Sequence, residues 1–224
     1  MASEISGWDS AYQYRPYSEK HPHPGVIYLD ELLGHKKQHI LDLGCGDGRH
    51  LVFLSRSGHN VHGIDKSLWG LRRAHEWLRR ENLSATLVCA VAQNLPWSNE
   101  FFDSVVSIQV IHHNRLAEII ETVGEVRRVL SPGGYFYLTV AKYPPANWKG
   151  HQYVEVEPHT FEPLEGFERG IPHHFFTKEE LQELLGDFEV RKLESDSKKH
   201  YSVLAQKKKR HPTLCVTDTS TGFR

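Results

Sequence analysis

The chain has 224 residues, with 27 Lys and Arg against 28 Asp and Glu, and a formal net charge of −1. This length suits one domain with a substantial core, and the balanced charge excludes a protein-wide attraction to nucleic acid or to a membrane. The three cysteines are widely spaced, which predicts reduced thiols and no disulfide framework. No signal peptide and no apolar run of about 20 residues is visible, so we expect a soluble, cytoplasmic protein.

Three regions are expected along the chain. Residues 1–38 form an aromatic, proline-rich segment and a lead-in helix, and alternating prolines disfavour regular structure in the first 24 residues. Residues 39–206 form the main domain, within which 141–175 is an irregular insertion and the expected substrate lid. Residues 207–224 form a basic tail that we expect to be mobile.

Apolar periodicity and turn signals predict alternating strands and helices within these regions. The strand that contains Cys89 is expected to be buried, and the two closing strands are expected to form a hairpin at the sheet edge. In chain order, the expected elements are a helix at about 25–33, a strand at 39–43, a helix ending at 58, a strand at 60–64, a helix at 68–82, strands at 85–90 and 102–108, a helix at 116–130, a turn at 131–134, a strand at 135–140, a helix at 177–186, and strands at 188–193 and 200–206.

The most informative stretch is ILDLGCGDGRH at residues 40–50. An apolar run leads into three glycines, Gly44, Gly46 and Gly48, and a second apolar run ends at Asp65. A strand, a glycine turn, a helix and a strand ending in a carboxylate are the opening half of a nucleotide-binding α/β sheet. Glycines let the backbone take positive φ and approach a ligand closely, and a carboxylate at Asp65 is placed to accept hydrogen bonds from ribose hydroxyls.

The residues around these glycines favour S-adenosylmethionine over a dinucleotide. A dinucleotide fingerprint spaces its glycines G-x-G-x-x-G so that a pyrophosphate meets a helix N-terminus. In this chain the glycines are spaced G-x-G-x-G between Asp42 and a helix start that carries Asp47. Asp47 would repel a pyrophosphate, whereas S-adenosylmethionine has a sulfonium and an ammonium group, and Asp42 can face that ammonium.

Further segments in the same order carry a resemblance to a known family. They are LDLGCGDGRHL, GIDKS, QNLPWSNEFFDSVVS, VIHH, EVRRVLSPGGYFYLTV and IPHHFFTKEEL. With these segments the chain resembles class I S-adenosylmethionine-dependent methyltransferases, and among them the small-molecule type 11 group that includes tellurite-resistance-type enzymes. The resemblance implies a doubly wound α/β fold with a seven-stranded, mostly parallel sheet, a last strand that is antiparallel, and a cofactor bound over the C-terminal strand ends.

The resemblance also implies which residues contact the cofactor, whose product is S-adenosylhomocysteine. The positions carried over are Gly44, Cys45 and Gly46 against the methionine part, Asp65 at the ribose, Lys66 and Ser67 flanking the adenosine, Ala92 and Gln93 at the adenine, and Gln109 beside the methionine and the methyl group. One position departs from the family, because Val91 stands where an acidic residue commonly recognises the adenine amino group. Either the backbone at Ala92 or the side chain of Gln93 recognises the adenine instead, or cofactor affinity is reduced, and loss of one such hydrogen bond is worth about 0.5–1.5 kcal/mol.

The acceptor is expected between the ends of the fourth and fifth strands and the 141–175 insertion. If the acceptor must lose a proton, a histidine suits a general base, and we assign that role to His113 or His174. The other residues of the predicted substrate site are His112, Asn114, Glu157, Thr160, Glu168, His173, His200 and Tyr201. The acidic insertion suits a cationic or amine-bearing acceptor. No metal site is predicted, because neighbouring side chains in extended structure point apart and an HH pair rarely gives two ligands.

The leading functional interpretation is therefore an S-adenosylmethionine-dependent methyltransferase that acts on a small molecule by in-line displacement. One alternative is an RNA or protein side-chain methyltransferase, although the sequence shows no basic groove and nucleic acid is not an expected partner. Another is an S-adenosylmethionine-binding regulatory protein without catalysis. A nicotinamide oxidoreductase is disfavoured by the glycine spacing. The sequence does not fix the acceptor atom or the oligomeric state.

Overall fold

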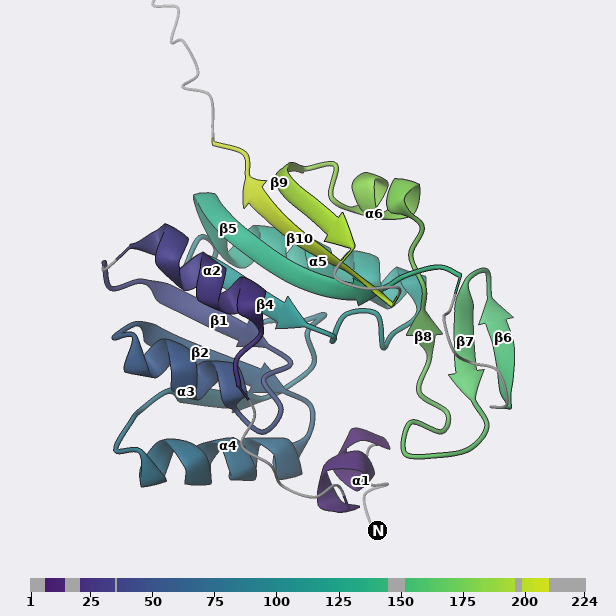
Figure 1. Cartoon of the computed structure of the whole chain (residues 1–224), viewed down its shortest axis with the longest axis horizontal. Helices are drawn as coiled ribbons and strands as arrows, with labels where there is room; N and C mark the ends of the chain where they lie inside the picture. Colours follow the sequence, from purple (N-terminus) through teal and green to yellow (C-terminus); the bar gives the residue numbers. More distant parts are fainter. Residues whose placement is uncertain (1–6, 15–20, 35, 145–151, 196–198, 210–224) are drawn as a thin grey trace, which may run out of the picture.

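A twisted seven-stranded sheet forms the centre of the computed structural model, which describes residues 7–14, 21–34, 36–144, 152–195 and 199–209 (Figure 1). The strand order is β3-β2-β1-β4-β5-β10-β9, and β10 is antiparallel to both of its neighbours. This confirms the predicted mostly parallel sheet with an antiparallel last strand. The strands are β1 (His39–Leu43), β2 (Asn60–Asp65), β3 (Thr86–Cys89), β4 (Phe102–Ile108), β5 (Leu130–Ala141), β9 (Phe188–Ser195) and β10 (His200–Lys207).

Successive apolar residues of the strands supply two separate cores, one on each face of the sheet. Ile40 of β1 packs in a cluster with side chains of the second, third and fourth helices, whereas its neighbour Leu41 packs with the fifth and sixth. Alternation along a strand requires this division, because consecutive side chains point to opposite faces. The helices are α1 (Gly7–Tyr14), α2 (Pro24–Leu33), α3 (Arg49–Arg56), α4 (Leu68–Arg80), α5 (Leu116–Val129) and α6 (Lys178–Leu184). Among the described residues, no helix has the length and apolar character required to cross a bilayer.

The prediction that the 141–175 insertion is irregular is wrong in part. Its described part contains β6 (Tyr153–Glu157), β7 (Thr160–Pro163) and β8 (His173–His174), which form a three-stranded antiparallel sheet beside the main one (Figure 1). We call this the small sheet. Phe161 and Phe175 pack against Ala141 at the end of β5, and this apolar contact stabilises the small sheet. The many polar residues of the segment are why its strands were not predicted from the sequence.

Three further expectations are corrected by the structure. The N-terminal segment contains α1, whose residues precede the prolines that were expected to prevent regular structure. The predicted turn at 131–134 lies inside β5, where the pairing with β4 shifts register. Cys89 is exposed, because β3 is an edge strand that pairs only with β2. Residues 210–224, most of the predicted mobile tail, lie outside the described residues.

Candidate functional site

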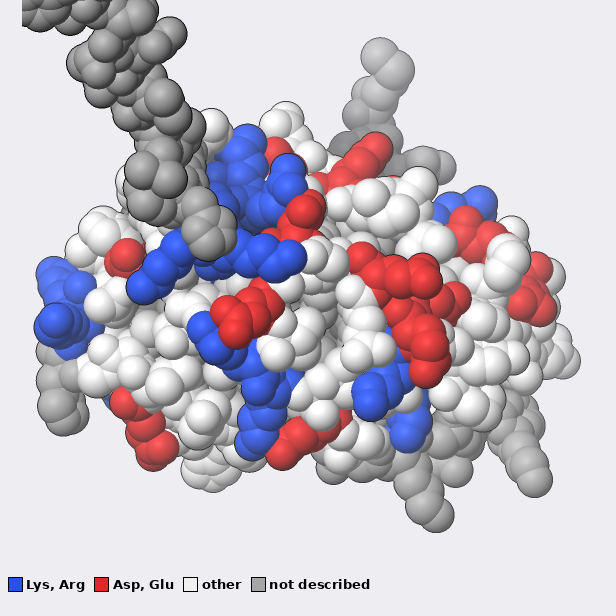
Figure 2. Space-filling view, turned by 90° about the horizontal axis from the view of Figure 1, so that it is seen from above, with Lys and Arg blue, Asp and Glu red and all other residues white. Residues whose placement is uncertain are grey.

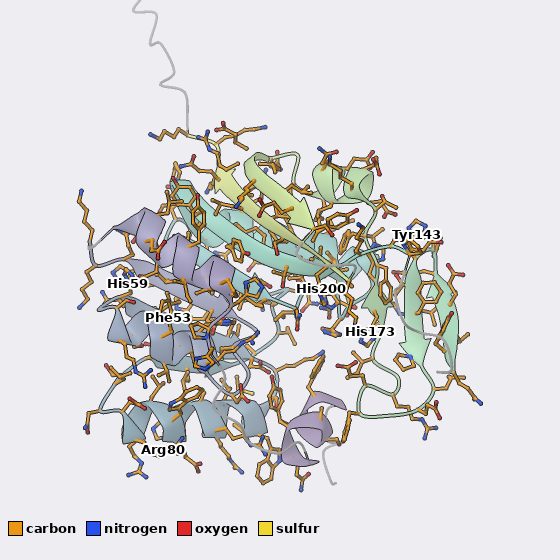
Figure 3. All side chains as sticks on the ribbon, in the orientation of Figure 1. Phe53, His59, Arg80, Tyr143, His173 and His200 are labelled. Carbon is orange, nitrogen blue, oxygen red and sulfur yellow. The ribbon has the colours of Figure 1, made fainter. Side chains whose placement is uncertain are left out.

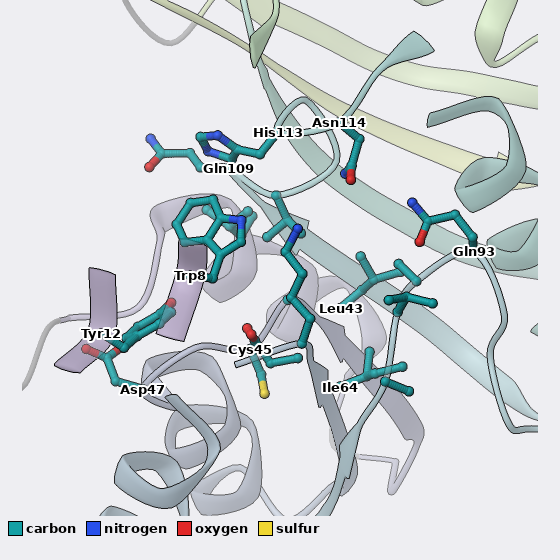
Figure 4. A pocket seen from close by; sticks show the side chains of 18 of the residues that line it. Trp8, Tyr12, Leu43, Cys45, Asp47, Ile64, Gln93, Gln109, His113 and Asn114 are labelled. Carbon is teal, nitrogen blue, oxygen red and sulfur yellow. The ribbon is translucent and has the colours of Figure 1, made fainter. Parts of the chain in front are cut away.

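A cavity of about 280 Å³ opens over the C-terminal ends of β1, β2 and β4 (Figure 4). In an open α/β sheet this is the edge at which ligands bind, where the chain leaves neighbouring strands in opposite directions. The residues that line the cavity are Trp8, Tyr12, Leu43, Gly44, Cys45, Asp47, Arg49, His50, Ile64, Asp65, Lys66, Ala90, Val91, Ala92, Gln93, Ile108, Gln109, Val110, His113, Asn114, Glu118 and Glu168.

The glycine turn between β1 and α3 forms the floor of the cavity. The backbone N–H groups of Gly44 and Cys45 both donate to the carbonyl of Ile64, at 2.8 and 3.0 Å, so the turn is fixed to the end of β2. Gly44 has φ +72°, and a Cβ at this position would overlap the methyl groups of Val110. Both observations explain why the sequence has glycine at this position.

Asp65 accepts one backbone hydrogen bond at each carboxylate oxygen. Gly46 N–H donates to Oδ2 and Ser67 N–H donates to Oδ1, both at 2.8 Å. Burial raises the pKa of this carboxyl to about 6, although the two backbone donors act in the opposite direction. The side chain is therefore held rigidly at the cavity wall, is ionised at neutral pH, and keeps lone pairs available for further hydroxyl donors.

Asp42 lies behind the glycine turn and does not line the cavity. It is 1% exposed, and its Oδ1 atom is 3.7 Å from Nδ1 of His50, which does line the cavity. Its Oδ2 atom is buried and has no hydrogen-bond partner among the described residues. An unpaired buried carboxylate oxygen is costly, and it places negative charge under the turn. The predicted contact of Asp42 with an ammonium group stays a prediction.

The loop after β3 forms the wall opposite the glycine turn and brings Val91, Ala92 and Gln93 to the cavity. Arg128 of α5 anchors the continuation of this loop, because its guanidinium donates to the carbonyls of Leu95 at 2.8 Å and Trp97 at 2.7 Å. The aliphatic side chain of Val91 is 51% exposed and stands on this wall of the cavity. It occupies the position at which the sequence resemblance implies a carboxylate.

Helix α1 covers part of the opening. Figure 4 shows Trp8 between Tyr12 and His113, and the Trp8 and His113 rings meet edge to face at 4.9 Å. Asp9 holds the helix in place, since its Oδ1 atom accepts from the Ser67 hydroxyl at 2.7 Å. Ser67 is thus a buried anchor for α1 and does not line the cavity.

The acceptor side of the cavity is formed by the loop after β4 and by the small sheet. Gln109 has φ +58° and donates its backbone N–H to Oγ1 of Thr139 at 2.9 Å, which turns the chain sharply at the end of β4. His113 and Asn114 follow, and Glu168 faces them from the loop between β7 and β8. Burial and the neighbouring histidines hold the pKa of His113 well below its usual 6.5, so this imidazole is uncharged at neutral pH.

Several predicted residues lie outside the lining. Gly46 reaches the site only through its bond to Asp65. His112 and His173 are buried behind His113, and Figure 3 shows His173 and His200 in the same region between β10 and β8. His174 lies within the small sheet, with its Nδ1 atom 2.8 Å from the Thr160 hydroxyl. Two more predicted substrate residues do not line the cavity. The carboxylate of Glu157 accepts from the Leu116 N–H at 2.7 Å, and Tyr201 packs in the main core.

The structure therefore brings together His113, Asn114 and Glu168 from the predicted acceptor set and leaves the others in its surroundings. The proposed base role of His113 or His174 is not tested by these positions and stays a prediction. Lining residues that the sequence reasoning missed include three polar side chains, Arg49, His50 and Glu118, whereas Asp47 of the glycine turn lines the cavity as its predicted repulsion of a pyrophosphate requires. Arg49 and His50 directly follow the glycine turn, a position that signals proximity to a ligand. Glu118 gives no such signal, because in sequence it is the capping-box acid of α5.

The lining fits a cofactor that carries positive charge. Four acidic side chains, Asp47, Asp65, Glu118 and Glu168, face the cavity against two basic ones, Arg49 and Lys66. A net acidic wall and the unpaired oxygen of Asp42 favour a cation and disfavour a pyrophosphate. With the glycine turn that has no room for a side chain, these features match the S-adenosylmethionine site expected from the sequence.

Comparisons with known proteins agree with this geometry. Residues 40–134 match a family model described as a methyltransferase domain. An uncharacterised methyltransferase of Synechocystis sp. is 37% identical over 121 residues, which are 54% of this chain and 54% of that relative. The 24-methylenesterol C-methyltransferase 2 of Oryza sativa subsp. japonica is 31% identical over 178 residues, 73% of this chain and 46% of that relative. The chain thus spans about half the length of these curated relatives.

Solved structures share the fold at lower identity. A SAM-dependent methyltransferase from Methanosarcina mazei superposes with a TM-score of 0.69 at 24% identity, over 85% of this chain and 100% of that one. The 1,6-didemethyltoxoflavin-N1-methyltransferase of Burkholderia thailandensis, solved with 1,6-didemethyltoxoflavin and S-adenosylhomocysteine, gives 0.65 at 18% identity, over 92% of this chain and 81% of that one. These likenesses confirm the predicted fold.

Proposed function

We propose that this chain, whose residues 40–134 match a methyltransferase-domain family model, is an S-adenosylmethionine-dependent methyltransferase that transfers a methyl group from that cofactor to a small molecule. The observation that carries the proposal is the acidic cavity at the strand ends, in which the Asp65 carboxylate is fixed by two backbone donors beside a glycine turn. The match to a methyltransferase family model supports S-adenosylmethionine as the cofactor. The volume of the cavity supports an acceptor of small-molecule size.

S-adenosylmethionine supplies an electrophilic methyl group on a sulfonium. The chain's own residues would bind and orient this cofactor. Asp65 would accept hydrogen bonds from the ribose hydroxyls, and the turn at Gly44 would let the backbone approach the ligand closely. Trp8 and Tyr12 of α1 cover the opening and limit access of water. Holding an acceptor in line with a reactive centre can supply a large part of a rate enhancement without any proton transfer.

The acceptor side suits a small molecule because side chains from three separate segments bound it. The Trp8 ring of α1 stands against His113, and Glu168 from the loop between β7 and β8 lines the same part of the cavity. Because its pKa is lowered by burial and by the neighbouring histidines, His113 is uncharged at neutral pH and presents a neutral ring to the acceptor space. The face seen in Figure 2 alternates groups of Lys and Arg with groups of Asp and Glu, which gives no support to a nucleic-acid acceptor.

The cofactor is tested first by calorimetric titration with S-adenosylhomocysteine, with NADH as the control ligand. We expect binding of S-adenosylhomocysteine alone, and its loss in Asp65→Ala. Glu76→Gln, a substitution on the exposed face of α4, is the matched control and leaves binding unchanged. Failure of the wild-type protein to bind S-adenosylhomocysteine would remove the basis of the proposed function.

The acceptor is tested with S-adenosylmethionine carrying a labelled methyl group. A cell extract is divided by size filtration, and the large fraction is treated separately with nuclease and with protease. Label that enters the small-molecule fraction supports the proposal. Label that is released only by nuclease or only by protease identifies a macromolecular acceptor, and binding without transfer to any fraction identifies a regulatory protein; either result overturns the small-molecule assignment.

A further inference from the structure

A histidine and carboxylate cluster adjoins the acceptor side of the cavity. Among the described residues, one ligand-type atom from each of His113, Glu168 and His173 lies within 4.8 Å of the other two. The three residues come from the loop after β4, the loop between β7 and β8, and β8 itself. A site assembled from separate elements has fixed ligand directions, which is the arrangement that a protein metal site requires.

We propose that His113, Glu168 and His173 bind a divalent transition metal ion of the zinc class, with an open coordination position directed into the cavity. Two imidazoles and one carboxylate, with a further position left for water or substrate, are the ligand set of catalytic zinc sites. His113 and Glu168 themselves line the cavity, so the open position faces the space assigned to the acceptor.

The hydrogen bonds of His173 carry the first part of the argument. Its Nδ1 atom is 2.8 Å from the carbonyl of Ile171, and its Nε2 atom is 3.1 Å from Oε2 of Glu168. Both neighbours are acceptors, so the His173 ring is held in one orientation from both sides. A metal-binding histidine characteristically gives one N–H to a backbone carbonyl and turns the other nitrogen to the metal. The ring of His173 has this arrangement, with Nε2 facing the carboxylate of Glu168.

The distances support the same assignment. Ligand atoms on a tetrahedral zinc ion lie roughly 3.3 Å apart, given bonds of about 2.0–2.1 Å. The 3.1 Å between Nε2 of His173 and Oε2 of Glu168 is close to this spacing. The His113 ring lies 4.5 Å from the His173 ring, centre to centre, and meets it at 80°, and one of its nitrogens lies within 4.8 Å of the ligand atoms of the other two residues.

His113 supplies an independent observation. Its Nδ1 atom is buried and has no hydrogen-bond partner among the described residues. An unpaired nitrogen lone pair in a buried position is unfavourable unless a ligand occupies it. The sequence argument that one HH pair rarely gives two ligands holds in this geometry, because each of the two pairs contributes one histidine.

The chemical role of the site rests on the proposed methyl transfer, whereas metal binding itself does not. An acceptor hydroxyl bound through its oxygen would release its proton to solvent more readily, since a bound divalent cation lowers the pKa of the group it coordinates. The oxygen lone pair then forms the new bond to carbon as the S–CH₃ bond breaks, and the electron pair stays on sulfur. The products are the methyl ether and S-adenosylhomocysteine.

The test is direct metal binding to the full chain, after removal of any affinity tag and dialysis against a chelator. Titration with Co²⁺ is followed by visible absorption, and titration with Zn²⁺ by competition with a chromophoric chelator. We expect one ion per chain and a Co²⁺ spectrum typical of mixed nitrogen and oxygen ligands. Glu168→Gln, an exposed substitution that leaves the core intact, weakens binding at least about 100-fold, as the loss of even an outer-shell partner weakens metal affinity by about 10–100-fold.

Matched controls separate this site from other histidines and acids. Glu165→Gln lies on the same exposed loop as Glu168, and His75→Ala lies on the exposed side of α4, and both retain full affinity. His173→Ala removes a second ligand and is read only if its thermal unfolding stays cooperative. Absence of stoichiometric binding to the wild-type chain, or equal binding by Glu168→Gln and Glu165→Gln, would overturn the proposal.

S-adenosylhomocysteine binding, measured on the metal-free and metal-loaded protein, distinguishes the two proposals. Metal binding at these ligands without any binding of S-adenosylhomocysteine would leave the metal site standing and remove the methyl-transfer role. Binding of S-adenosylhomocysteine by a chain that binds no metal would leave the methyl-transfer proposal standing and remove the metal site.

Discussion

Acidification is a direct perturbation of the cofactor site, because the carboxyl group of Asp65 has a pKa of about 6. Above this pH the group is ionised and accepts hydrogen bonds from ribose hydroxyls, and below it the proton occupies one acceptor oxygen. Only about one tenth of a group with this pKa is ionised at pH 5. We therefore expect S-adenosylhomocysteine to bind about tenfold more weakly at pH 5 than at pH 7.

Calorimetry at closely spaced pH values is the assay, and Asp65→Asn and Glu76→Gln are the variants. We expect Glu76→Gln to follow the wild-type curve and Asp65→Asn to bind weakly at every pH, without the inflection near 6. Wild-type affinity that stays within twofold between pH 7 and pH 5 would refute the reasoning, and so would an unchanged inflection in Asp65→Asn.

The same carboxyl group affects the stability of the ligand-free protein with a definite sign. Its pKa is higher in the folded chain than the ordinary 3.8, so the folded state binds more protons than the unfolded state between these values. The contribution of Asp65 to the free energy of unfolding therefore falls as the pH rises from about 4 to about 6, by about 3 kcal/mol in total. Chemical denaturation of the wild-type and Asp65→Asn proteins across this range measures the difference.

Three further substitutions test other parts of the site. Gly44→Ala is expected to abolish binding of S-adenosylhomocysteine, because the new methyl group overlaps a valine side chain. Gly58 also has a positive φ but lies in open space, so Gly58→Ala costs only about 1–2 kcal/mol of stability. Arg128→Lys should lower the free energy of unfolding by about 1–3 kcal/mol and weaken cofactor binding, because the loop after β3 loses its anchor. In the control Arg127→Lys, at an exposed ion pair, the free energy of unfolding measured by denaturant titration should change by less than about 0.5 kcal/mol. Asp9→Ala releases α1 from α4 and should speed dissociation of S-adenosylhomocysteine about fivefold in stopped-flow fluorescence; an unchanged rate would show that α1 does not restrain the ligand.

The individual strands and the floor of the cavity were predictable because both depend on local patterns, whereas the number and direction of the strands in the sheet were implied by the family resemblance. Ile40 and Leu41 face opposite cores as alternation requires, and the spacing from Gly44 to Asp65 closes one turn against the next strand. Each of these features is contained within about 25 residues, so apolar periodicity and glycine placement suffice to predict it.

Features that depend on distant contacts were not predictable in the same way. The link between Asp9 and Ser67 joins residues 58 positions apart, and no local pattern indicates that α1 reaches the cavity. The small sheet has many polar residues in its strands and is stabilised by packing against Ala141. This contact joins residues that are distant in the sequence, so no local pattern predicts it. The exposure of Cys89 depends on β3 being the edge of the sheet, and strand order is a property of the whole topology.

Backbone hydrogen bonds form one part of the attachment of the small sheet to the main domain. His174 N–H donates to the carbonyl of His112 at 2.8 Å, and just beyond β8 Phe176 N–H donates to the carbonyl of Ala141 at 2.9 Å. Backbone hydrogen bonds are available to almost any residue type, so this part of the attachment does not depend on which side chains the strands carry. The segment 153–174 therefore has the properties of an exchangeable cassette, in which evolution or an engineer can replace acceptor-facing residues while the cofactor half of the protein stays the same.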